Sequence, residues 1–184
     1  MQRILVIRGG AIGDFVLTLP AVKLLRDEYP HARLEILGYK HITALAEKRF
    51  YARATRSIEY APLAGFFAKG RELDAELSRY FGSFDLVVSY LFDPDGIFQR
   101  NIERCGVEMF ITGPPKIAAN EHAAIRLARP LEQLGLTLHD CAPRVYPSED
   151  DREFARSFLG TVSAPLALHP GSGSPTKNWP IENW

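Results

Sequence analysis

An aspartate follows a glycine-rich turn near the start of the chain. The turn begins with Gly9 and Gly10 directly after a short aliphatic run, and it leads through Gly13 to Asp14. Glycines let a ligand approach the backbone, and free N–H groups at the start of a following helix favour anions. Asp14 has two interpretations. It stabilises the first turn of a helix through the helix dipole, or it is a general base placed where open α/β sheets bind ligands.

This turn fits a dinucleotide-binding fingerprint poorly. When G-x-G-x-x-G is aligned on Gly10 and Gly13, its first glycine falls on Arg8. The second expected strand ends at Leu37 and Gly38, without the acidic residue that would bind a ribose hydroxyl. The sequence therefore disfavours a nicotinamide- or flavin-dependent oxidoreductase, and we expect no cofactor.

A second loop, close to the C-terminus, combines residue types that bind phosphate groups. They are Ser172, Gly173, Ser174 and Lys177. Pro180 is typical of the first turn of a helix, so backbone N–H groups, hydroxyls and an ammonium group precede a helix start, as a diphosphate site requires. No Gly-Lys-Ser/Thr sequence closes this loop, so it is not a Walker loop. The alternative is an ordinary flexible loop at a domain entry.

The elements that must position these residues alternate along the chain. Strands are expected at residues 4–7, 33–37, 57–60, 84–90 and 107–112. Helical patterns lie between them, which predicts a doubly wound parallel α/β sheet. The first helical pattern contains Pro20, so we expect a kink or a restart there. Further helices are expected at 41–49, from Asn120 to Gly135, and from Ser148 to about Gly160.

A new cycle of strand, loop and helix begins near Ala164. We therefore predict an N-terminal domain at residues 1–163, and at 164–184 the first strand, phosphate loop and helix start of an incomplete second domain. The last helix is expected to be unstable alone, because isolated helices shorter than about 12 residues are marginal in water.

The composition is that of an ordinary globular protein, with 46% hydrophobic and 24% charged residues. The formal net charge of zero argues against a general nucleic-acid-binding protein. No stretch approaches the roughly 20 apolar residues of a membrane span, and we expect a cytoplasmic protein. A basic stretch at 48–56 suits peripheral contact with a membrane or an anionic acceptor, or an ordinary solvated face. No metal site is expected, because a turn explains the Asp-Pro-Asp-Gly sequence.

Two motifs resemble those of family 9 glycosyltransferases, which include the ADP-heptose:lipopolysaccharide heptosyltransferases. The first is I-L-V-I-R-x-G-A-I-G-D-x-x-L-T-x-P-A at residues 4–21. The second is H-P-G-S-G-x-x-x-K-x-W-P-x-x-x-W at residues 169–184. Segments at 84–96 and 120–136 also look like the family's middle segments. The resemblance covers essentially the whole chain.

This resemblance implies the GT-B arrangement of two Rossmann-like lobes, with the second lobe truncated here. It implies an inverting, metal-independent transfer from a nucleotide-sugar, an ADP-sugar, to a lipid-linked or saccharide acceptor in lipopolysaccharide-type glycan synthesis. The implied site residues are the base Asp14, the donor phosphate ligands Ser172, Gly173, Ser174 and Lys177, and the acceptor-side residues Gly10, Gly13 and His122.

The family's later donor-site motifs would lie beyond residue 184. We therefore expect this chain alone to be inactive in sugar transfer. The alternative is a non-catalytic module that binds an acceptor. Both interpretations keep the first lobe, and the sequence does not separate them.

Overall fold

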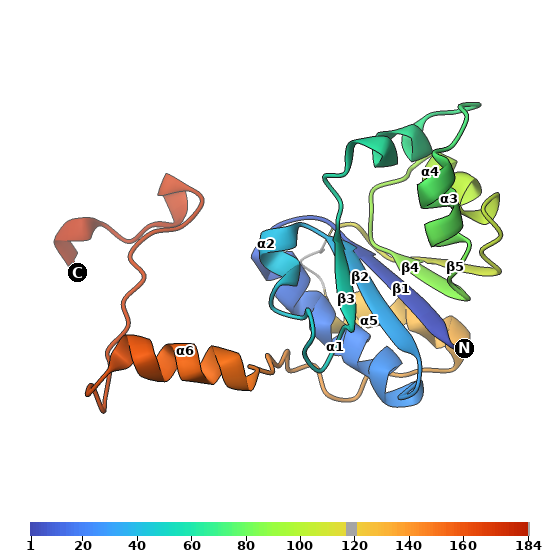
Figure 1. Cartoon of the computed structure of the whole chain (residues 1–184). Helices are drawn as coiled ribbons and strands as arrows, with labels where there is room; N and C mark the ends of the chain where they lie inside the picture. Colours follow the sequence, from blue (N-terminus) through green and yellow to red (C-terminus); the bar gives the residue numbers. More distant parts are fainter. Residues whose placement is uncertain (117–120, 184) are drawn as a thin grey trace. The chain divides into compact units, whose positions relative to one another are not determined.

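The computed structural model describes residues 1–116 and 121–183. They divide into two compact units, Met1–Tyr146 and Pro147–Trp184. The first unit is a five-stranded parallel sheet in the order β3-β2-β1-β4-β5, with helices on both faces (Figure 1). This arrangement confirms the predicted Rossmann-like α/β fold.

The strands are short and lie close to their predicted positions. They are β1 Arg3–Arg8, β2 Arg33–Gly38, β3 Ala54–Ser57, β4 Leu86–Ser89 and β5 Met109–Thr112. The prediction for the third strand, at 57–60, was displaced toward the C-terminus. Residues 54–57 form the strand instead, because they pair in register with Glu35–Gly38 of β2.

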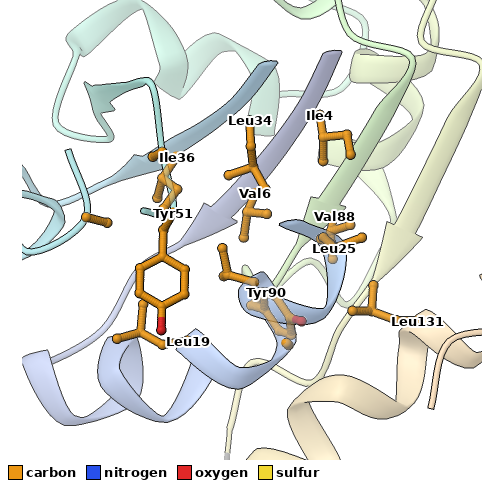
Figure 2. Packing of buried hydrophobic residues seen from close by; sticks show 14 of the residues in the cluster. Ile4, Val6, Leu19, Leu25, Leu34, Ile36, Tyr51, Val88, Tyr90 and Leu131 are labelled. Atoms are coloured by element: carbon orange, nitrogen blue, oxygen red, sulfur yellow. The ribbon is translucent and has the colours of Figure 1, made fainter. Parts of the chain in front are cut away.

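The central strand β1 is buried on both faces, and its side chains alternate between two apolar clusters. Ile4 and Val6 face one cluster, and Leu5 and Ile7 face the other. The first cluster, seen closely in Figure 2, is covered by α1 (Ile12–Glu28), α5 (Ala123–Ala128) and the 3₁₀ helix η2 (Arg129–Leu134). The second is covered by the 3₁₀ helix η1 (Ala61–Phe67), α3 (Ala75–Phe81) and α4 (Ile97–Glu103). Each fully buried aliphatic side chain contributes about 1.5–3 kcal/mol, so β1 is firmly held.

Helix α1 carries the predicted catalytic aspartate in its first turn. It runs from Ile12 to Glu28 and contains Pro20, so the restart, one of the two outcomes expected at this proline, does not occur. The proline ring is buried against the core. The hydroxyl of Thr18 donates to the Asp14 carbonyl at 2.7 Å, four residues earlier. The buried face of α1 thus fixes the helix start relative to β1.

The helix predicted at 41–49 was wrong in extent. Only Lys40–Thr43 forms a helix, α2, and turns follow it. Lys48 has a left-handed backbone with φ of 53°, which an α-helix does not accommodate. Gly135 ends η2 with φ of 76°, as predicted. Asn120, the predicted cap of the preceding helix, lies outside the described residues.

The second unit contains the predicted helix α6, Glu149–Leu159. The Ser148 hydroxyl accepts from the Asp151 N–H at 3.1 Å, and the Asp151 carboxylate accepts from the Ser148 N–H at 2.8 Å. This reciprocal cap confirms the predicted helix start. Leu159 is followed by Gly160, the predicted end.

The first strand predicted within residues 164–184, at 165–169, is absent from the described part of this unit. Leu166 and Leu168 are 85% and 65% exposed, and no described strand pairs with them. A buried parallel strand needs neighbours on both sides for its N–H and C=O groups. Two short 3₁₀ turns follow, η3 Pro175–Lys177 and η4 Ile181–Asn183. Along the chain, the first unit ends at Tyr146 and the second begins at Pro147, whereas the domain boundary near Ala164 stays a prediction.

Candidate functional site

The carboxyl ends of the parallel strands β1, β2, β3 and β4 meet at one edge of the sheet. Open α/β sheets bind ligands outside this edge. The order β3-β2-β1-β4-β5 reverses its direction at β1, so the turn after β1 lies at the switch point of the topology. This turn holds Gly9, Gly10 and Ala11 and leads into α1.

Asp14 is tied to the backbone of this turn. Its Oδ2 accepts a hydrogen bond from the Ala11 N–H at 3.0 Å. Its side chain is 37% exposed, which leaves the carboxylate reachable from solvent. Gly10 has φ of 96°, and a Cβ at this position would lie 2.7 Å from Asp14 Oδ2. The turn therefore needs glycine at residue 10, both for its backbone conformation and for the space that the carboxylate occupies.

Arg8 lies behind this carboxylate, and the sequence reasoning did not select it as a site residue. Its Nη2 is 3.5 Å from Asp14 Oδ1, and its side chain is only 2% exposed. Burial lowers the pKa of the Arg8 guanidinium from its ordinary value, and the charge of Asp14 opposes that shift. A charged residue that ends an aliphatic strand was the signal in the sequence.

The guanidinium of Arg8 is held on its other sides by the core. Its Nη1 donates to the Pro115 carbonyl at 3.3 Å, and its central carbon lies 5.6 Å from the centre of the Tyr90 ring. The Tyr90 hydroxyl donates in turn to the Leu127 carbonyl at 2.7 Å. Burial raises the pKa of Tyr90. Arg8 Nε and Nη2 have no hydrogen-bond partner among the described residues, and they form one edge of the guanidinium.

The other residues predicted for the acceptor side are only partly brought together. Gly13 lies in the first turn of α1, beside Asp14, and a Cβ there would meet no atom within 4 Å. His122 lies directly before α5, with an exposed side chain that caps no N–H group of the described helix. Within the described residues no hydrogen bond or ion pair joins His122 to Asp14. The structure thus places Gly10, Gly13 and Asp14 in one turn and gives His122 no defined part in it.

The predicted phosphate loop lies in the second unit and is exposed. The Ser172 hydroxyl donates to the Ser174 carbonyl at 2.9 Å, and the Ser174 hydroxyl lies 2.8 Å from that of Thr176. The Lys177 N–H donates to the Ser174 carbonyl at 3.0 Å, and Gly173 is exposed between the two serines. The hydroxyls therefore bond within the loop itself, and Lys177 is exposed to solvent.

A hollow with aromatic walls opens near the carboxyl ends of β2, β3 and β4, and we call it the aromatic pocket. Its volume is about 590 Å³. Its lining includes Tyr39, Glu59, Tyr60, Phe67 and Phe92. These residues follow three different strands or lie in η1, so their proximity was not predictable from their spacing in the sequence.

Among the described residues no group of three His, Cys, Asp or Glu side chains could hold a metal ion. In that same part of the chain, no helix has both the length and the hydrophobicity needed to cross a membrane.

Comparisons with known proteins give similarity in structure alone. No protein-family model matches the sequence, and no curated protein matches it. The glycosyltransferase family 9 structure from Veillonella parvula superposes with a TM-score of 0.70 at 20% identity, covering 98% of this chain and 57% of that one. The Escherichia coli heptosyltransferase WaaC with ADP-2-deoxy-2-fluoro heptose gives 0.60 at 15%, with 100% and 63% covered. The Escherichia coli ADP-heptose lps heptosyltransferase II gives 0.56 at 15%, with 98% and 58% covered.

These similarities extend over nearly the whole of this chain, which spans less than two thirds of the length of each of the three structures. At such low identity they concern the fold and not the chemistry. The chain thus has the fold found in glycosyltransferase family 9 structures.

Proposed function

We propose that this chain is the acceptor-side part of an inverting, metal-independent glycosyltransferase. The reaction moves a sugar from a nucleotide-sugar, an ADP-sugar, to a hydroxyl of a lipid-linked or saccharide acceptor in lipopolysaccharide-type glycan synthesis. The similar WaaC structure, which holds an ADP-sugar analogue, supports the choice of donor. The observation that carries the proposal is the placement of Asp14 at the switch point of the sheet, fixed from one side and exposed on the other.

Asp14 acts as the general base in the proposed reaction. A sugar hydroxyl is a poor nucleophile until its proton is being removed. As the acceptor oxygen attacks the anomeric carbon, its proton passes to the Asp14 carboxylate. The bond from the anomeric carbon to the diphosphate oxygen breaks, and the nucleoside diphosphate leaves with the electron pair. Attack on the face opposite the leaving group inverts the anomeric configuration.

Arg8 positions this base. The Ala11 N–H fixes one carboxylate oxygen, and the buried guanidinium faces the other at 3.5 Å. One hydrogen bond and one ion pair limit the rotation of the carboxylate, so the carboxylate is already oriented when the acceptor binds. Arg8 does not touch the substrate in this proposal, because its side chain is buried behind Asp14.

The C-terminal loop stabilises the charge of the departing diphosphate in this proposal. Lys177, the Ser172 and Ser174 hydroxyls and the Gly173 backbone supply the donor phosphate contacts in the proposal. A cationic and N–H-rich loop stabilises the charge that develops on a leaving diphosphate. In this chain the loop is exposed and bonded within itself, so we propose that the chain alone does not transfer sugar.

A second candidate is a non-catalytic module that binds an acceptor. It is favoured by the segment before this loop, because residues 165–169 form no strand here and the loop has no fixed support for a donor. Both candidates share the first unit and differ only in whether catalysis follows binding.

A joined protein separates the two candidates. In it the whole chain is continued by the uncovered remainder of the Veillonella parvula glycosyltransferase. We expect the joined protein to convert an ADP-sugar and a saccharide acceptor to a product of higher mass, detected by mass spectrometry, with an inverted anomeric centre detected by NMR. The chain alone should yield none. A folded joined protein that makes no product from any ADP-sugar supports the binding module.

A further inference from the structure

We propose that the aromatic pocket binds an uncharged sugar ring, and that this ring is the acceptor. The inference deepens the proposed function and rests on it for the word acceptor. The pocket is built at the sheet edge where Asp14 also lies, from residues after β2, β3 and β4 and from η1. Its volume of about 590 Å³ falls in the range of small-molecule sites.

The walls of the pocket include aromatic side chains that are partly exposed. Phe67 stacks on Phe98 with ring centres 4.6 Å apart at 18°, so one of its faces is covered by a rigid core ring. Phe67 as a whole is still 40% exposed. Phe92 is 67% exposed at the pocket wall. The C–H groups on one face of a pyranose carry partial positive charge and pack on the negative face of an aromatic ring.

The pocket also carries polar groups, which favour a sugar over an acyl chain. Tyr39 and Tyr60 contribute phenol groups, and Glu59 contributes a carboxylate. A phenol donates and accepts, and an ionised carboxylate accepts, which matches the hydroxyls of a saccharide. An acyl chain would cover these groups without bonding to them, and leaving them unpaired opposes its binding.

The charge of the pocket excludes an anionic ring. None of the described lining residues is a lysine or an arginine, and Glu59 is negative. The nearby Arg56 lies over the Tyr60 ring at 5.2 Å, and its Nη2 bonds to Glu76 Oε1 at 2.5 Å. Its charge is therefore compensated outside the pocket. A sugar acid or sugar phosphate would meet Glu59 without a cation to offset it.

Two side chains that line the pocket lie against the turn that leads to the base. A Cβ at Gly9 would lie 3.4 Å from Leu91 Cδ2 and 3.8 Å from Ile58 Cδ1, and both of these residues line the pocket. At the next residue, Gly10, a Cβ would lie 2.7 Å from Asp14 Oδ2. Leu91 and Ile58 thus lie against Gly9, and Gly10 lies against the carboxylate. We therefore expect a ring bound in the pocket to lie near the turn that leads to Asp14.

The test is an NMR titration of the 184-residue chain with two matched probes, methyl α-D-glucoside and methyl α-D-glucuronide. They differ only in a carboxylate at C6. We expect the glucoside to shift the amide signals of pocket residues with a Kd on the order of 1 mM, as suits a ligand of this size. The glucuronide should bind about tenfold more weakly, and Glu59→Gln should narrow that difference.

Phe92→Ala should weaken glucoside binding about tenfold, since a stacked face is lost. Phe154→Ala is the matched control, because Phe154 is a comparably exposed phenylalanine in α6 of the other unit. This control should bind as the unchanged chain does. Hexanol serves as a third probe.

Shifts with hexanol alone, or equal binding of glucoside and glucuronide, overturn the inference. Absence of any shift at pocket residues overturns it as well. If the glucoside binds but the joined protein is inactive, the pocket is a sugar site and the proposed sugar transfer is wrong. If the joined protein is active but the pocket residues show no shifts, the proposed transfer stands and the pocket is not the acceptor site.

Discussion

The turn after β1 and the loop at 171–180 carry the two halves of one proposed reaction, yet they differ in how they are held. Asp14 is fixed by the Ala11 N–H, faces a buried arginine and starts a helix packed on the sheet. Lys177 and its neighbouring hydroxyls are exposed, and the hydroxyls bond within the loop. Each region resembles a motif in the sequence.

The two regions differ in how far the rest of the fold fixes their side chains. Ordering one residue of a flexible loop costs about 1–2 kcal/mol, and a ligand must supply this energy if the fold has not. The turn after β1 is ordered by β1 itself, whose alternating side chains pack in the two apolar clusters.

The largest expected effect is that of Asp14→Asn on turnover of the joined protein. Asparagine keeps the shape and still accepts from the Ala11 N–H, but it cannot take a proton. We expect kcat to fall by about 10²–10⁴-fold, the usual contribution of a general base. The free energy of unfolding should fall by more than the roughly 0.3–1 kcal/mol of the helix-dipole term, because the buried Arg8 guanidinium also loses its counter-charge. Initial rates and urea denaturation measure the two. A loss of turnover below about threefold would leave Asp14 as a residue of the helix start.

Arg8→Met comes next. The change removes the buried charge and keeps an unbranched side chain in a space bounded by Tyr90 and Pro115. Only Arg8 is changed. The Asp14 carboxylate that remains is 37% exposed and can be solvated, whereas the buried Nε and Nη2 of Arg8 have no hydrogen-bond partner among the described residues. We expect no loss in the free energy of unfolding, and a fall in kcat of roughly 10- to 100-fold as the base loses its orientation.

Arg8→Lys is the control, because it keeps the positive charge and removes the planar guanidinium. We expect its kcat to lie between that of Arg8→Met and that of the unchanged joined protein. The opposite pattern would show that the guanidinium supports the fold. In that pattern, unfolding becomes easier by more than about 3 kcal/mol, and kcat of the folded protein is unchanged.

The sequence predicted the fold of the first region well and its site only in part. Short aliphatic runs between helical patterns specify a parallel sheet, and β1, β2, β4 and β5 lie where those runs are. Asp14 and Gly10 were selected from the local glycine-rich pattern and from the family resemblance, and their roles stay a prediction. Arg8 was missed as a partner, because its contacts with Pro115 and Tyr90 join residues far apart in the chain.

In the second region the prediction succeeded only for α6. Its cap is local, formed between Ser148 and Asp151. The strand at 165–169 depends on neighbours in a sheet, and local sequence does not supply them. The aromatic pocket escaped prediction for a related reason, since three loops from separate strands form it.

Two glycines of the first region provide a matched pair for stability in the chain as it stands. Gly10→Ala places a Cβ at a residue with φ of 96° and 2.7 Å from Asp14 Oδ2, so we expect the free energy of unfolding to fall by about 1–3 kcal/mol. Gly13→Ala meets no atom within 4 Å and lies in a helix, so it should stabilise by up to about 1 kcal/mol. Urea denaturation measures both. Equal effects of the two changes would mean that the turn before Asp14 is not fixed.

The smallest expected effect is that of Lys177→Ala on nucleotide binding by the chain alone. The loop offers one exposed ammonium group and few fixed donors, and ordering it opposes binding at about 1–2 kcal/mol per residue. We expect calorimetry to detect no binding of ADP by the chain, with or without Lys177. In the joined protein the remaining lobe should order the loop, so ADP should bind. Lys177→Ala should weaken ADP binding there. The loss of affinity should shrink at high salt, because the contact stays partly exposed. Tight binding of ADP by the chain alone, unchanged in Lys177→Ala, would place a nucleotide site in the first unit. The roles given to the two regions would then have to be exchanged.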